Sequence, residues 1–161
     1  MFHYSLQNFK DLVGDFYRKL GTEPEELDGS ILFLEIDEAA VAFEFLPAEN
    51  ALVLWSQIDE VDGVDVTAEV QEKALSINLL TLFTGGGALC FNDASRRLLY
   101  ALPVAPDGLT VEVFEERLRG FLAGRKLVTS RLVNLVTSAR AGEEKFPGAA
   151  EGPDQQVIFN V

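Results

Sequence analysis

The chain has little of two residue types on which catalytic and covalent sites are often built. It holds one cysteine, Cys90, and one histidine, His3, in 161 residues. A single cysteine excludes an intrachain disulfide and suits a reducing compartment. Because Cys90 lies in the apolar run 88–91, we interpret it as a buried thiol in a strand and not as a nucleophile. No thiol cluster or suitably spaced carboxylate pair accompanies His3, so we predict no catalytic residue, no metal site and no cofactor.

Basic residues are also scarce. The chain has 13 lysine and arginine residues against 26 aspartate and glutamate residues, which gives a formal net charge of -13. An acidic surface gains no counterion-release energy from a polyanion, so nucleic acid and anionic lipid are not expected partners. The charge is also explained by solubility alone.

Long apolar stretches with targeting or membrane character are missing as well. The first residues show no basic region followed by an apolar run, so we expect no secretory signal. Residues 74–92 carry no charge, but three glycines and several polar side chains interrupt them, and we expect no membrane span. Hydrophobic residues nevertheless make up 48% of the chain. One domain of this size should leave some of that apolar area for a partner, which indicates a binding protein.

Apolar spacing predicts the first half of the chain. A helix begins after Ser5 and ends at Gly21, because its apolar residues recur at helical intervals. Short apolar runs then predict three strands, 31–36, 41–45 and 51–58, and the short turns between them require antiparallel pairing. In the first strand Ile31 and Phe33 share a face with carboxylates, which is typical of a core edge or of a docking surface.

The segment 67–83 is predicted to be a helix that becomes apolar on almost every side from Leu75 onward. Such a helix needs cover on two sides, and a second copy of the chain is the economical partner. We therefore predict a homodimer interface at Leu75, Leu79, Leu82 and Phe83. A glycine run at 85–87 ends this helix and should precede two strands, 88–92 and 97–104, and then a last helix that is capped by Thr110 and ends near residue 141.

These elements resemble the class I type III secretion chaperones, the family that includes the Tir chaperone. The resemblance rests on the apolar helix, the glycine break, the hairpin ending in Leu102, Pro103 and Val104, and the helix that opens at 108–110. It covers residues 5–141 in the order α-β-β-β-α-β-β-α. It implies an α+β fold in which helices flank a twisted antiparallel sheet, in one domain of residues 1–141.

The resemblance also implies a function. A chaperone of this family is a non-enzymatic homodimer of the bacterial cytoplasm that binds the N-terminal segment of a secreted effector and keeps it unfolded and secretion-competent, with the secretion apparatus as a further partner. We expect the effector to contact Phe2, Leu12, Ile31 and Phe33, apolar positions that the inward stripes do not require. Two alternatives stay open: a protein-binding or sensor module of the same fold outside secretion, and an enzyme with an unrecognised site.

Residues 142–161 lie outside the resemblance. Glycine and proline make 142–154 a flexible linker, and the run 155–161 alternates apolar residues like a strand. Such a strand could shield a free sheet edge until a client arrives, by pairing along it. A disordered chain end is the competing interpretation.

Overall fold

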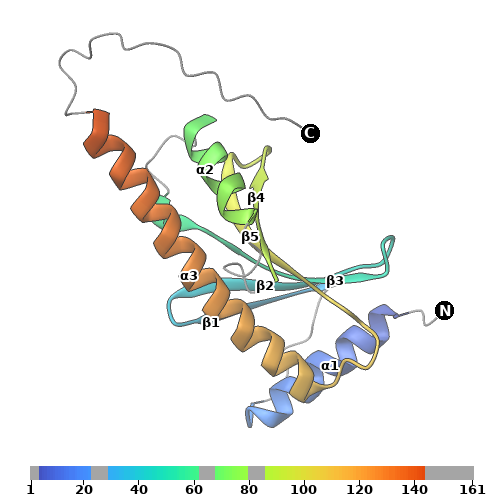
Figure 1. Ribbon diagram of the computed structural model, residues 1–161. Coiled ribbons are helices and arrows are strands. Elements are labelled where there is room, and N and C mark those ends of the chain that lie inside the picture. Colours follow the sequence, from blue (N-terminus) through green and yellow to red (C-terminus); the bar gives the residue numbers. More distant parts are fainter. Residues whose placement is uncertain (1–3, 23–28, 62–67, 80–85, 144–161) are drawn as a thin grey trace, which may run out of the picture.

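The computed structural model describes residues 4–22, 29–61, 68–79 and 86–143. Within these ranges, three helices, five strands and one short 3-10 helix follow one another (Figure 1): α1 (Leu6–Lys19), β1 (Ile31–Ile36), β2 (Ala39–Leu46), β3 (Ala51–Gln57), η1 (Asp59–Val61), α2 (Ala68–Asn78), β4 (Ala88–Asn92), β5 (Arg97–Val104) and α3 (Val111–Glu143). The predicted α+β order of helices and strands is confirmed. The predicted extension 142–161 falls almost wholly outside the described residues, and so does the shielding strand 155–161.

The helix ends use the residues that the sequence offers for them. Ser5 is the N-cap of α1 and forms a capping box with Asn8, whose backbone amide donates to Ser5 Oγ at 3.1 Å. The chain leaves α1 through Gly21 at φ 73°, a left-handed conformation that glycine adopts without strain. At α3 the Val113 amide donates to Thr110 Oγ1 at 3.4 Å. These caps position α1 and α3 as predicted.

The five strands form one antiparallel sheet in the order β1-β2-β3-β5-β4. The first three strands make the predicted meander, with Asp37 and Glu38 at positive φ in the tight turn between β1 and β2. β5 then pairs with β3, and β4 lies outside β5 (Figure 1). β1 and β4 are therefore the edge strands of this sheet.

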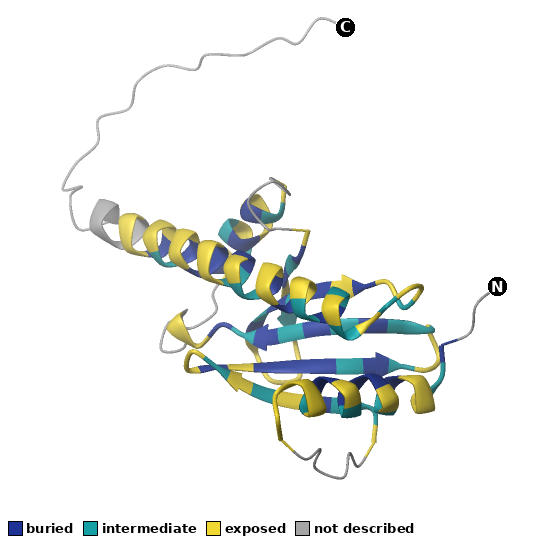
Figure 2. Cartoon of the chain, turned by 90° about the horizontal axis from the view of Figure 1, so that it is seen from below, coloured by how far each residue is buried: buried dark blue, intermediate teal, exposed yellow. Residues whose placement is uncertain are grey.

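All three helices contribute to one hydrophobic core on a single face of the sheet. Phe43 lies at its centre, with the ring centroid of Phe9 from α1 at 5.2 Å and that of Phe114 from α3 at 4.6 Å. Further along α3, Phe121 packs on Tyr100 of β5 at 5.1 Å. Buried residues accordingly line the sheet side of the helices, while exposed residues follow their outer side (Figure 2).

The helix α2 ends earlier than predicted, at Asn78, and Leu79 lies in the turn that follows. The rest of the expected continuation, 80–83, lies outside the described residues. At this end the Asn78 side chain amide donates to the carbonyl oxygen of Leu89 and accepts from the Leu89 amide, both at 2.8 Å. These two bonds tie the last turn of α2 to β4. Only one side of the helix is buried, through Val70, Ala74 and Ile77.

The glycine run has a packing role at Gly87. A Cβ placed there would lie 2.5 Å from the Tyr100 ring, so no larger residue fits without moving that ring. Tyr100 is fully buried. The close approach of this backbone to the core requires glycine.

Candidate functional site

The face of the sheet opposite the helices carries an aromatic patch formed by Ile31, Phe33, Ala42, Val53 and Trp55. Phe33 is 63% exposed, and its ring meets that of Trp55 edge to face with centroids 6.2 Å apart and planes at 89°. Ala42 separates them in the strand register, pairing with Phe33 on one side and Trp55 on the other. A small residue between two large rings leaves a shallow apolar surface.

A hydrogen bond fixes the indole of this patch. Trp55 Nε1 donates to Glu44 Oε2 at 2.9 Å, between neighbouring positions of β3 and β2. The polar end of the ring is thus satisfied, and its apolar faces stay available for contact. Large apolar side chains held in place on an accessible sheet face are typical of a protein-binding surface.

The patch borders a strand edge. β1, which carries Ile31 and Phe33, pairs only with β2 among the described residues. The backbone groups on its outer side can therefore pair with an added strand, while the patch receives alternate side chains of that strand. The geometry suits an extended peptide.

A groove with a volume of about 770 Å³ lies between α1 and the segment that leads into α3. One wall carries Asp11 and Asp15 of α1, and residues 106–112 form the other. Among the described residues that line it, Lys19 is the one cation, and its Nζ lies 2.9 Å from Glu115 Oε2 and 3.6 Å from Glu112 Oε1. We call this feature the acidic groove.

Two pKa shifts reflect the contacts around the acidic groove. The hydrogen bond to Glu115 raises the pKa of Lys19, and the nearby Glu112 carboxylate adds to the effect. Glu112 accepts from its own backbone amide and from Thr110 at the start of α3, which together with Lys19 lowers its pKa. Both groups are therefore charged at neutral pH. Tyr4 is different, because burial and then the charge of Asp11 raise the pKa of its phenol to about 12.

A third exposed feature is the outer side of α2. Leu75 is 67% exposed and Leu79 is 83% exposed, opposite the buried residues of the helix. These two predicted interface residues lie four positions apart and thus neighbour each other on the surface. The other two, Leu82 and Phe83, lie outside the described residues.

The predicted effector contacts do not all come together. Ile31 and Phe33 share the aromatic patch. Phe2 lies outside the described residues. The interpretation of Leu12 as a spare apolar position is wrong, because it is 6% exposed and belongs to the core on the opposite face of the sheet. Leu12 follows Phe9 by three positions and precedes Phe16 by four, so helical spacing places it on the buried stripe.

Cys90 also differs from its prediction. It is exposed and not buried, because β4 is an edge strand and Cys90 points away from the helices while its neighbour Leu89 points toward them. Partial desolvation raises the pKa of its thiol, which disfavours the reactive thiolate.

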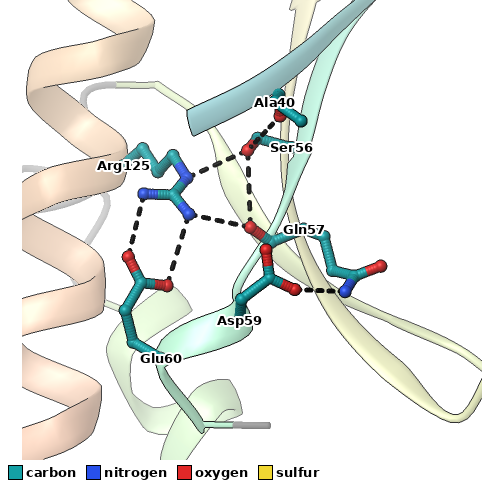
Figure 3. Close-up of polar contacts among 6 residues, drawn as sticks. All are labelled: Ala40, Ser56, Gln57, Asp59, Glu60 and Arg125. Carbon is teal, nitrogen blue, oxygen red and sulfur yellow. Dashed lines mark hydrogen bonds and ion pairs between the residues drawn. The ribbon is translucent and has the colours of Figure 1, made fainter. Parts of the chain in front are cut away.

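A partly buried polar network holds the middle of α3 against the sheet (Figure 3). The guanidinium of Arg125 donates to Ser56 Oγ and to the Gln57 carbonyl, each at 2.9 Å, and contacts the two carboxylate oxygens of Glu60 at 3.1 and 3.3 Å. Ser56 Oγ in turn donates to the Ala40 carbonyl at 2.7 Å. Because every contact comes from the chain itself, the network stabilises the fold and offers little to a ligand.

Neither a cluster of metal ligands nor a membrane-spanning helix occurs in the described part of the chain. No group of three or more histidine, cysteine, aspartate or glutamate side chains that could hold a metal ion occurs in residues 4–22, 29–61, 68–79 and 86–143. Within the same ranges, no helix combines the length and apolar character that crossing a bilayer requires.

Sequence reasoning missed Trp55, Glu44 and Arg125. Trp55 could have been found, because the alternation of β3 places it on the same face as Val53. The contacts of Arg125 and the lining of the acidic groove come from segments far apart in the sequence, so no local pattern predicts them.

Known proteins resemble this chain in sequence pattern and in fold. The model of the Tir chaperone protein (CesT) family matches residues 11–127. No curated protein matches the sequence. Among solved structures, the ExsC-ExsE complex contains a similar chain, with a TM-score of 0.65 and 19% identity over 79% of this chain and 95% of that one.

Two further structures show the same fold. The HopA1-SchA chaperone-effector complex has a chain with a TM-score of 0.60 and 20% identity, over 79% of this chain and 98% of that one. The heterodimeric ExoU-SpcU complex from the type III secretion system of Pseudomonas aeruginosa has a chain with a TM-score of 0.54 and 18% identity, over 76% and 96%. The likeness extends over nearly the whole length of each of these chains.

Proposed function

The chain belongs to the Tir chaperone protein (CesT) family, and we propose that it is a cytosolic homodimer that binds the N-terminal segment of a secreted type III effector. It keeps that segment unfolded and secretion-competent. The similar structures support an effector as partner, since one is a chaperone-effector complex and another comes from a type III secretion system. The proposed activity contains no catalytic step and no cofactor.

The aromatic patch beside the edge of β1 carries this proposal. An unfolded client offers apolar side chains and unpaired backbone groups together. The patch receives the side chains, and the outer edge of β1 receives the backbone in the same register. Holding a client in this way needs buried apolar area and hydrogen bonds but no ATP.

The proposed dimer uses the outer side of α2. Leu75 and Leu79 together leave a large apolar surface in water. A second α2 related by a two-fold axis would cover both residues with the same two residues of its partner, which is how closed dimers form. Leu82 and Phe83 belong to the same proposed interface.

Affinity purification from the native host tests the function. The tagged protein should retain a stoichiometric protein that is secreted and whose N-terminal fragment alone is sufficient for binding. A stoichiometric partner that is not secreted would support the alternative of a binding or sensor module outside secretion. Recovery of no partner at all from cells that actively secrete would contradict both.

A further inference from the structure

We propose that the acidic groove is a second docking site, separate from the aromatic patch, and that it takes a basic amphipathic segment in which lysine or arginine alternates with apolar residues. The identification of this segment as part of a client rests on the proposed function. The preference of the groove for a basic amphipathic segment can be tested whether or not the proposed function holds.

The groove has charged walls and an apolar floor. On α1, Asp11 and Asp15 lie four positions apart and form one wall, while Asp107 lies in the opposite wall. Leu109 and Val111, both half-buried, supply the accessible apolar part of the lining, whereas Leu12 lines the groove but is almost fully buried. A volume of about 770 Å³ is large enough for several side chains, so a short peptide fits better than a single ion.

The carboxylates of the acidic groove differ in whether a cation of the chain already pairs with them. Asp15 contacts Arg18, and Glu112 contacts Lys19. Asp11 accepts a hydrogen bond from Gln7, but no cation of the described residues pairs with it or with Asp107. The two walls therefore face each other with one uncompensated carboxylate each.

An anionic occupant is disfavoured, although the groove includes the first turn of α3. The N-terminus of a helix attracts anions through its free amides. Here Thr110 accepts from the Val113 amide, and the Glu112 carboxylate accepts from its own amide. The chain therefore satisfies these donors with its own oxygens and adds a negative charge beside them. The overall charge of -13 repels an anion further and attracts a cationic segment over a longer range.

The apolar floor decides between a peptide and a simple polycation. A polyamine would satisfy Asp11 and Asp107 but leave the half-buried Leu109 and Val111 in contact with water. A segment with both basic and apolar side chains covers the floor and reaches both walls. This combination also fits an unfolded client, because an unfolded segment presents its basic and apolar side chains together.

Three synthetic peptides test the proposal, with identical apolar residues and with lysine, glutamine or glutamate at the alternate positions. Fluorescence anisotropy should show the lysine peptide binding the wild-type protein at least about tenfold more tightly than the glutamate peptide. The Asp11→Asn, Asp107→Asn variant should bind the lysine peptide about three- to thirtyfold more weakly, which corresponds to two partly exposed ion pairs. The Asp11→Lys, Asp107→Lys variant should prefer the glutamate peptide.

A matched control removes the same number of charges elsewhere. The Glu49→Gln, Asp93→Asn variant loses two exposed carboxylates from the β2-β3 and β4-β5 turns and should bind the lysine peptide like the wild type. Equal weakening in the control and in the groove variant would reduce the effect to net charge and overturn the proposal. Amide chemical shifts of the wild-type protein give a test without substitutions. Shifts at residues 8–15 and 106–112 support the groove, and shifts confined to other elements contradict it.

These outcomes are separate from those of the proposed function. If the native host yields a secreted client that binds the groove variant as tightly as the wild type, the groove proposal fails and the chaperone function stands. If the lysine peptide binds the groove but no secreted client is found, the groove stands and the chaperone function fails.

Discussion

Phe33 and Trp55 meet edge to face across the strand that separates them, with ring centroids 6.2 Å apart. The contact needs Ala42 between them, because any larger residue in that register position would hold the rings apart. Phe33 stays 63% exposed despite the contact, so most of its surface remains open to a partner while Trp55 supports one side of the ring. Prearranged aromatic side chains lose little conformational entropy on binding, which makes them effective anchors.

Replacement of Phe33 by alanine should weaken client binding by about 1–3 kcal/mol, as expected for the loss of a central aromatic anchor. The melting temperature should change little, because most of the ring is exposed. Calorimetric titration of the captured client fragment measures the effect. Leu20→Ala, which removes a similarly exposed apolar side chain at the end of α1, is the control and should leave the affinity unchanged. Equal affinities of wild type and Phe33→Ala would remove the aromatic patch from the client site.

Leu75→Glu together with Leu79→Glu should convert the proposed dimer into a monomer. A carboxylate at this contact would be desolvated without a partner, at a cost of several kcal/mol. Both side chains are exposed in the subunit, so the fold should survive. Sedimentation velocity reports the oligomeric state and circular dichroism the fold. Leu20→Glu is the control, and a folded dimer of unchanged stability in the double variant would exclude this face of α2.

Gly87→Ala and Gly120→Ala should change stability in opposite directions. The added methyl at Gly87 meets the buried Tyr100 ring at 2.5 Å, and overpacking of this kind costs about 1–3 kcal/mol. Gly120 lies in the middle of α3 on its exposed side, and a methyl there meets nothing within 4 Å. Alanine should therefore raise the free energy of unfolding by up to about 1 kcal/mol through its higher helix propensity. Urea denaturation measures both. A neutral Gly87→Ala would show that the Tyr100 ring moves freely.

Arg125→Met should destabilise the protein by about 1–3 kcal/mol. The change leaves the part-buried Gln57 carbonyl and the buried Ser56 Oγ without their guanidinium donor, and an unsatisfied buried acceptor costs more than the bond itself was worth, while water can hydrate the exposed Glu60 carboxylate. Thermal unfolding with the exposed Arg119→Met as reference isolates the network, because among the described residues the side chain of Arg119 bonds only the Glu115 carbonyl, one turn away on the same helix. Similar unfolding temperatures for the two variants would show that α3 holds its position without the network. Arg125→Lys should not restore stability, since one ammonium cannot reach three partners in a plane.

Local pattern was sufficient for much of the fold. Helical spacing and the cap at Ser5 determined the limits of α1, and the alternation of β1 determined that Leu32 points to the core while Phe33 points away from it. The sequence likewise predicted Thr110 as the cap at the start of α3. These features depend on residues within a few positions of one another, so the backbone conformation and the apolar period are enough to specify them.

The candidate sites were decided by contacts between distant segments. The Asn78 side chain ties the last turn of α2 to β4 through two backbone groups of Leu89, a contact that the sequence of the helix does not predict. Cys90 is exposed because β5, and not β4, pairs with β3. The contact of Phe33 with Trp55 requires the register of three strands, and the acidic groove requires α1 to lie beside the start of α3. The sequence by itself determined which residues are apolar, charged or capping, but tertiary packing decided which of them meet, because strand register and helix docking are set by the whole core at once.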